Sequence, residues 1–205
     1  MRMRLVLLLA AFPLLGAAAP APASSPGPAK DPVATVRAAE RQVRLAFQSG
    51  GKRADLERVG ATFVAWDEVT RRSLPGRFEK LSPADRAAIE KAQRALVEET
   101  WFSGLLRPDP LFALAVLGSS TAGTDTEVKT VLQSAGRQAR VEFQLVRGKD
   151  GRFRVIDLAV NGVSALGGYR EQFPQLLDLG GVPHLLETLA IQRRALVEMR
   201  VPRNP

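Results

Sequence analysis

Residues that could carry out chemistry are few in this chain. It has one histidine, His184, and no cysteine among its 205 residues. A protein metal site needs several such ligands, and no second ligand stands at metal-binding spacing from His184. A phosphate-binding loop of the G-x-x-x-x-G-K type is also missing. We therefore expect no metal and no cofactor, and we interpret His184 as a polar residue at the start of the last helix.

Two serine-containing stretches match catalytic motifs only in part. Residues 162–166, GVSAL, begin like a nucleophile elbow, but Leu166 stands where the second glycine belongs. Residues 49–52, SGGK, have the S-x-x-K spacing without the partner motifs of that enzyme class. We interpret Ser164 as a helix N-cap, whose hydroxyl accepts a hydrogen bond from a first-turn amide. The S-x-x-K stretch is interpreted as a linker.

Asp157 and Tyr169 are the best remaining polar pair. A carboxylate and a phenol inside an apolar cone can act as base and oxyanion donor, as in ketosteroid isomerases. Alternatively, Asp157 binds backbone groups or Arg170, and Tyr169 packs against the sheet. An acid and a phenol alone rarely make a catalytic site. We expect no enzyme, and a small-molecule enzyme on a cone-shaped fold is the alternative.

The segment that carries this pair, residues 155–173, predicts a strand that leads directly into a helix. Ile156, Leu158 and Val160 alternate with polar or small residues, which is the period of a strand. Asn-Gly at 161–162 then ends the strand. Leu166, Tyr169 and Phe173 follow at the spacing of one helix face.

The first residues have the pattern of a secretory signal peptide. Arg2 and Arg4 precede an apolar run that is too short to span a bilayer. We expect cleavage after Ala23, so that residues 1–23 are a signal peptide, residues 24–30 a flexible tether and residues 31–205 a single domain. An exported chain without cysteine has no disulfides and depends on its core.

Helix start signals mark the N-terminal half of the domain. Asp31 followed by Pro32 and Ser82 followed by Pro83 are N-caps with proline at the first helical position. Apolar residues at helical spacing follow both, and two shorter helices are expected between them, ending by Leu74. The C-terminal region predicts two further helices, separated at Gly-Gly 180–181.

The middle of the chain predicts strands at 112–117, 128–132, 139–145 and 153–160. Residues 119–126 are rich in Gly, Ser and Thr and indicate a turn, and Asp150-Gly151 forms the core of a hairpin turn. Short connections between successive strands indicate an antiparallel meander. The expected fold is α+β: a four-stranded curved antiparallel sheet packed against N- and C-terminal helices. The apolar pattern alone does not show whether sheet and helices enclose an apolar cavity or a filled core.

The net charge of the chain does not by itself exclude any class of partner. The formal net charge is +8, and loss of Arg2 and Arg4 with a signal peptide would lower it by two. Basic residues are scattered, without the aromatic interleaving or the modules of nucleic-acid-binding proteins. We expect no nucleic-acid partner and interpret most of these charges as solubilising.

The segment at 155–173 resembles the MlaC/toluene-tolerance family of periplasmic phospholipid-binding proteins. The similarity rests on the pattern V, Asp, apolar, GVS, YR-QF, here Val155, Asp157, Gly162 to Ser164, Tyr169, Arg170, Gln172 and Phe173. Residues 63–67, FVAWD, then Leu74, and residues 81–86, LSPADR, are similar to the family's helical region, and 127–130, EVKT, to one of its strands. Trp66-Asp67, Phe78, Pro75-Gly76 and Trp101 depart from the family's usual residues.

This resemblance implies a periplasmic carrier of glycerophospholipid that maintains outer-membrane asymmetry and tolerance to toluene. It also implies two partners, an outer-membrane lipoprotein complex and an inner-membrane ABC transporter with a lipid-binding membrane-anchored subunit. Such a carrier holds the acyl tails between sheet and helices. A third hypothesis, an adaptor whose interior is filled by its own side chains, predicts no cavity large enough for an acyl chain.

The residues expected to line the cavity are apolar positions of the helices, the strands and the strand–helix segment. Arg170 is the candidate for the lipid head group, with an ion pair to Asp157 or Glu171 as the alternative. The expected lipid-binding residues are Phe63, Leu74, Phe78, Ile89, Leu96, Trp101, Phe102, Phe112, Leu114, Val116, Val141, Phe143, Leu145, Val163, Leu166 and Tyr169.

Overall fold

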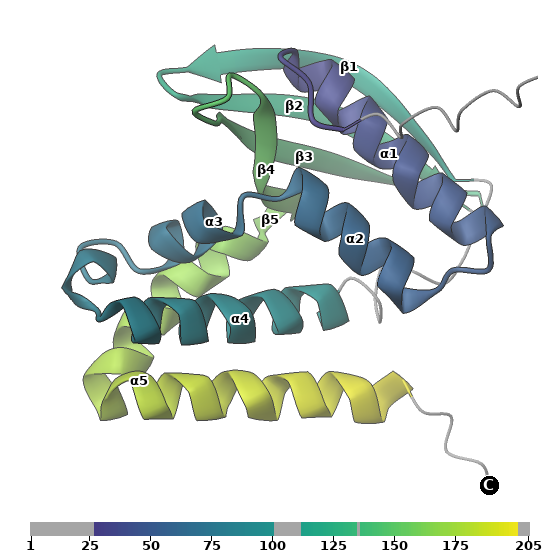
Figure 1. Cartoon of the computed structure of the whole chain (residues 1–205). Helices are drawn as coiled ribbons and strands as arrows, with labels where there is room; N and C mark the ends of the chain where they lie inside the picture. Colours follow the sequence, from purple (N-terminus) through teal and green to yellow (C-terminus); the bar gives the residue numbers. More distant parts are fainter. Residues whose placement is uncertain (1–26, 101–111, 135, 201–205) are drawn as a thin grey trace, which may run out of the picture.

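A computed structural model describes residues 27–100, 112–134 and 136–200 of the chain. Helices precede and follow one sheet, which is the expected α+β order (Figure 1). The helical elements are α1 (Pro32–Gln48), α2 (Arg53–Phe63), α3 (Trp66–Ser73), the 3-10 turn η1 (Phe78–Lys80), α4 (Pro83–Thr100) and α5 (Ala165–Arg200).

The strands form one antiparallel sheet in the order β1-β2-β3-β4-β5, curved and not closed into a barrel. The sequence predicted four strands, and the structure adds a short fifth. Asn161 and Gly162 have φ of 49° and 82°, so they form a tight hairpin turn rather than a simple break. The strands are β1 (Ala113–Ala122), β2 (Asp125–Ser134), β3 (Arg137–Arg147), β4 (Phe153–Val160) and β5 (Val163–Ser164).

The predicted turn at residues 119–126 is wrong for most of its length. β1 continues to Ala122 and β2 begins at Asp125, so only Gly123 and Thr124 connect them. The Thr121 and Thr126 hydroxyls lie 3.0 Å apart across this hairpin. Small polar residues indicated a turn, but threonine is also a good strand residue where a hairpin extends into solvent.

The predicted helix starts are confirmed. The Asp31 side chain accepts a hydrogen bond from the Ala34 amide at 2.6 Å, and Ser82 Oγ accepts one from the Asp85 amide at 3.1 Å. The last helical region bends where glycines were expected to break it. Gly180 and Gly181 leave the helical conformation, and Gly181 has φ of 68°.

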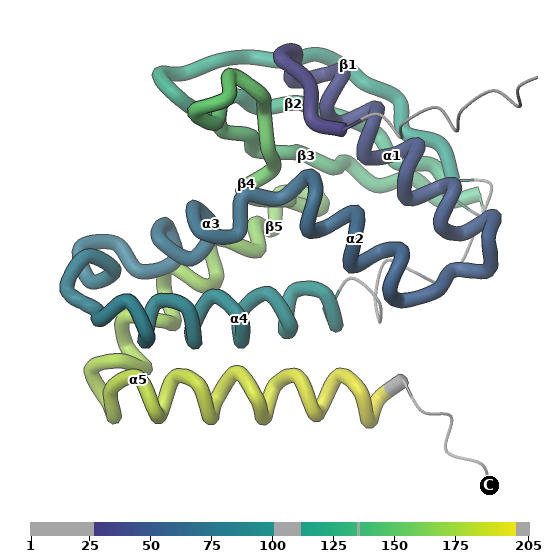
Figure 2. The backbone as a smooth tube through the Cα atoms, in the orientation of Figure 1, coloured from purple at the N-terminus to yellow at the C-terminus, as the bar shows by residue number. Residues whose placement is uncertain are grey.

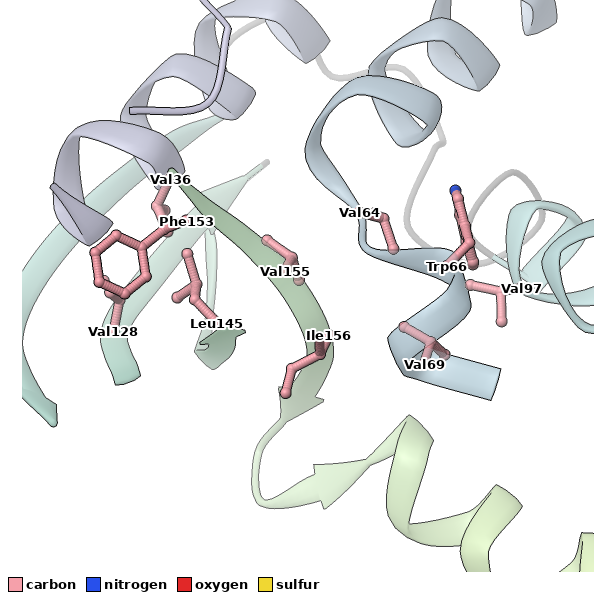
Figure 3. Packing of buried hydrophobic residues seen from close by; sticks show 10 residues of the cluster. All are labelled: Val36, Val64, Trp66, Val69, Val97, Val128, Leu145, Phe153, Val155 and Ile156. Atoms are coloured by element: carbon pink, nitrogen blue, oxygen red, sulfur yellow. The ribbon is translucent and has the colours of Figure 1, made fainter. Parts of the chain in front are cut away.

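The elements form layers, with the sheet and α1 at one side and α4 beside the C-terminal half of α5 at the other (Figure 2). One buried cluster joins the sheet to α1, α3 and α4, as Figure 3 shows for Val128, Leu145, Val155 and Trp66. A second cluster lies among α4, α5 and the end of α3. Its buried members are Leu74, Ile89, Leu96, Phe173, Leu185 and Leu189.

Asp157 fixes the segment where the sheet passes into α5. Its carboxylate accepts hydrogen bonds from the Ser164 hydroxyl and, at 2.9 Å, from the Leu166 amide. Ser164 Oγ in turn accepts the Gly167 amide at 2.7 Å, which confirms its role as N-cap. Together the two side chains satisfy first-turn amides that a helix leaves without partners.

An ion-pair cluster ties α3 to β2 at the other end of the sheet. Arg72 contacts Asp125 through both terminal nitrogens and Glu68 through Nε. The hydrogen bond from Arg71, opposed by burial and aided by Arg72, lowers the pKa of Glu68 to about 2. Hydrogen bonding to Arg72 likewise lowers the pKa of Asp125.

Replacing Asp157 with alanine should lower the free energy of unfolding by about 2 kcal/mol, because α5 loses two charge-assisted hydrogen bonds at its first turn. Urea denaturation measures this change. The control is Glu187→Ala, an exposed carboxylate in the middle of α5, for which we expect less than about 0.5 kcal/mol. Equal effects of the two substitutions would contradict the role given to Asp157.

The Arg72 cluster should stabilise the fold in a pH-dependent way. Folded-state pKa values that lie below the usual ones add stability above about pH 4.5, and this stability is lost as the pH falls toward 2. Arg72→Met should therefore lower the free energy of unfolding by about 1 kcal/mol or less near pH 6. The difference in this free energy between the variant and the wild type should become smaller near pH 2.5. Urea unfolding at both pH values tests this, and a constant difference would refute it.

A cavity between the sheet and the first two helices

The main candidate site is an apolar cavity of about 220 Å³ between the sheet and the helices α1 and α2. For scale, a protein cavity of about 150 Å³ accommodates benzene. Side chains from three helices and four strands contribute to its wall. They are Val36, Ala39, Glu40, Val43, Phe47, Leu56, Val59, Gly60, Phe63, Val64, Glu98, Phe112, Leu114, Leu132, Ser134, Val141, Phe143, Val155 and Leu158.

The helical wall follows from the apolar spacing of α1 and α2. In α1 the lining residues Val36, Val43 and Phe47 recur at helical spacing, so they share one face. Leu56 and Phe63 occupy the corresponding positions of α2. Val36 and Phe63 are buried, and Val36 also packs into the core cluster, whereas Val43, Phe47 and Leu56 remain partly exposed.

A bulge in β4 shapes the sheet wall. Leu145 pairs with Val155 and Gln144 with Asp157, so Ile156 is an extra residue in the ladder. Val155 and Leu158 consequently both face the cavity although they are three residues apart. The alternation predicted for residues 156–161 is interrupted at this point, because a bulge turns the following side chains to the opposite face.

Two carboxylates interrupt the apolar wall, and both are paired with arginine. Glu40 pairs with Arg44 one turn later on α1. Glu98 of α4 accepts a hydrogen bond from Arg94 Nε at 2.8 Å. Each arginine also lies over an aromatic ring: Arg44 over Phe112 at 5.1 Å, and Arg94 over the Trp66 ring at 5.5 Å. Neutralised in this way, the carboxylates are compatible with an apolar ligand beside them.

A second, smaller cavity contains the pair Asp157 and Tyr169. It has a volume of about 30 Å³ and shares Val64, Val155 and Leu158 with the main cavity. Burial, together with the charge of Asp157, raises the pKa of Tyr169 to about 12. The Asp157 carboxylate is already bonded to the α5 first turn. This arrangement agrees with the structural interpretation of Asp157, in which it binds backbone groups.

The structure brings five of the expected lining residues together in the main cavity: Phe63, Phe112, Leu114, Val141 and Phe143. Their common feature is a position on α2 or on the cavity-facing side of the first three strands. Val116 and Leu145 lie on the same sheet face but pack into the adjoining core cluster.

The other expected lining residues lie elsewhere. Leu74, Ile89 and Leu96 are buried between α4 and α5, with Phe78 packed against them. Leu166 and Tyr169 line the small cavity. Val163 is 76% exposed and faces solvent. Arg170 is exposed on α5 and is not among the residues that line either cavity, and Trp101 and Phe102 fall outside the described residues.

The lining residues of α1 were missed by the sequence analysis although their signal was present. Val36, Val43 and Phe47 form an apolar stripe in the sequence, but a stripe does not show which partner it faces. The longer helix α4 was assigned to the cavity instead. In the structure its apolar face packs against α5, which leaves α1 and α2 to cover the sheet.

No group of three or more His, Asp or Glu side chains in residues 27–100, 112–134 and 136–200 is placed to hold a metal ion. His184 is half-buried within α5, three residues after the bend. Its carbonyl oxygen accepts a hydrogen bond from the Thr188 hydroxyl at 2.9 Å.

Comparison with known proteins gives matches of two kinds. A solved structure of a phospholipid-binding protein from Ralstonia solanacearum, in complex with a phospholipid, matches with a TM-score of 0.71. The two chains are 18% identical, and the match covers 80% of this chain and 97% of the other. No curated protein matches the sequence. The family model described as MlaC protein matches residues 34–190, so this chain belongs to the MlaC family.

Proposed function

We propose that this protein is a phospholipid carrier and not an enzyme, and that it holds lipid acyl chains in the main cavity. The observation that carries the proposal is the cavity wall, in which apolar faces of α1 and α2 stand opposite the apolar face of the sheet. Membership of the MlaC family supports it, and so does the bound phospholipid of the structurally similar Ralstonia protein.

A phospholipid that crosses water without a carrier pays a large free-energy cost. A diacyl lipid carries roughly 30 methylene groups, and exposing each to water costs about 0.8 kcal/mol. Free passage of the lipid through water is therefore negligible. A cavity that resembles the bilayer interior removes most of this cost, so that loading and unloading are nearly balanced.

Full loading requires a wider cavity than the one described. By comparison with a benzene-sized cavity, 220 Å³ holds about nine carbon atoms. The helices α1 and α2, joined through Gly50 and Gly51, form one wall of the cavity. Displacement of this pair would widen the cavity without disturbing the packed cluster between α4 and α5.

The carrier would work in the periplasm, with residues 1–23 as its export signal, residues 24–30 as a tether and residues 31–205 as one lipid-binding domain. It would exchange phospholipid with an outer-membrane lipoprotein complex and with an inner-membrane ABC transporter that has a lipid-binding membrane-anchored subunit. Of the helices described, none has the length and apolarity needed to cross a membrane. The charge-poor cavity wall suits uncharged tails and leaves the head group at the mouth.

Organic extraction of the protein purified from a bacterial host tests the proposal directly. Mass spectrometry should find diacyl phospholipid in an amount approaching one molecule per chain. A folded preparation without bound lipid, which still takes up none from phospholipid vesicles, would count against the carrier function.

Filling the cavity should displace lipid without unfolding the protein. Ala39 lines the cavity, whereas Ala34 is exposed on the same helix. Ala39→Phe places a ring where the acyl chain would lie, so lipid occupancy should fall about ten-fold, at a stability cost of about 1–3 kcal/mol. Ala34→Phe should leave occupancy unchanged. Lipid extraction and thermal melting of both variants measure this, and equal occupancy would exclude this cavity as the lipid site.

A further inference from the structure

Beside Ser134, which lines the main cavity, β3 carries a cation that the carrier function described above does not use. We propose that Arg137, at the start of β3, binds the phosphate of the lipid head group while the acyl chains occupy the cavity. The inference rests on the proposed carrier function and adds to it a preference for lipids that bear a phosphate.

Strand register places Arg137 at this position. Arg137 pairs with Ser134, and Ser134 lines the cavity. Residues directly opposite in antiparallel strands project from the same face of the sheet. Arg137 therefore extends the cavity-facing row by one position beyond the wall, where it is exposed.

The row of cavity-facing residues continues across β2 to the start of β1. Phe112 directly precedes Ala113, which pairs with Gln133, the residue before Ser134. Phe112 lines the cavity and stands under the guanidinium of Arg44. The spacing between adjacent strands puts the Phe112 end of the row about 10 Å from Arg137.

Arg137 is an uncommitted cation at this end of the cavity-facing row. Arg44 is held by Glu40, and Arg94 by Glu98. Arg53, near the start of α2, is paired with Glu57 and Glu99. Arg137, by contrast, makes no ion pair with any residue in the described part of the chain.

The guanidinium of Arg137 and a lipid phosphate are complementary in charge and in hydrogen bonding. A guanidinium presents parallel N–H donors that fit two oxygens of a phosphate, and it keeps its charge at every physiological pH. The lining of the cavity is almost entirely apolar. A lipid phosphate is therefore better placed at Arg137 outside the lining, with the acyl chains inside.

The test uses the full mature protein and vesicles of phosphatidylglycerol that contain a minor fraction of diacylglycerol with the same acyl chains. Mass spectrometry of the bound lipid gives the ratio of phosphatidylglycerol to diacylglycerol. Arg137→Ala should lower this ratio about three- to five-fold relative to the wild type, the range of an exposed charge pair. Arg137→Lys, which keeps the charge, should recover part of it.

The matched control is Arg152→Ala. Arg152 is exposed in the turn at the far end of β3 and β4, about 30 Å from Arg137 along the strand, and its removal changes the net charge equally. This variant should keep the wild-type ratio. An unchanged ratio in Arg137→Ala, or an equal fall in both variants, would overturn the inference. Melting temperatures of all variants should agree with the wild type.

A phosphate titration distinguishes a lipid head group from a free phosphate ion at Arg137. Titration of the lipid-free protein with inorganic phosphate should show no saturable binding at millimolar concentration. Saturable binding that Arg137→Ala abolishes, with an unchanged lipid ratio, would make this a site for the free ion and would overturn the inference. Failure of the wild-type protein to bind either lipid would instead refute the carrier function.

Discussion

The arrangement of this molecule depends on one backbone contact between its helices and its sheet. The Ala65 amide donates a hydrogen bond to the Val155 carbonyl at 3.0 Å, and Val64 forms a parallel bridge with the same residue. This contact lies between the end of α2 and the start of α3. It anchors the chain to β4 at the junction between α2 and α3 (Figure 1). On one side of this junction α2 lines the cavity, and on the other α3 contributes Trp66 and Val69 to the core.

The contact divides the protein into two parts with different packing. On one side, α3, α4 and α5 bury their apolar faces against each other around Leu74, Ile89 and Phe173. On the other side, α1 and α2 stand over the sheet and leave a hollow interior. Both parts contribute buried apolar side chains to the core, and only the part beneath α1 and α2 leaves a cavity of about 220 Å³. The edge contact of Phe47 with Phe112, 6.3 Å between ring centres, holds the end of α1 over β1.

Local signals in the sequence predicted the elements, because caps, hairpin turns and period-two strands act over a few residues. Asp31, Ser82 and Ser164 cap helices as expected. The cavity wall could be predicted only in part. Apolar periodicity marks a buried face but not the element that it meets, so α4 residues were expected in the cavity and the lining residues of α1 were missed. The bulge at Ile156 depends on strand pairing, which no local pattern reveals.

The paired carboxylates of the cavity wall have a consequence for the cavity when it is empty. A purely hydrocarbon hollow stays dry when emptied, and its walls lose their contacts without compensation. Glu40 and Glu98 offer acceptor oxygens from two different helices. Water that enters the empty cavity can hydrogen-bond to these oxygens, so the empty state does not have to be a dry void.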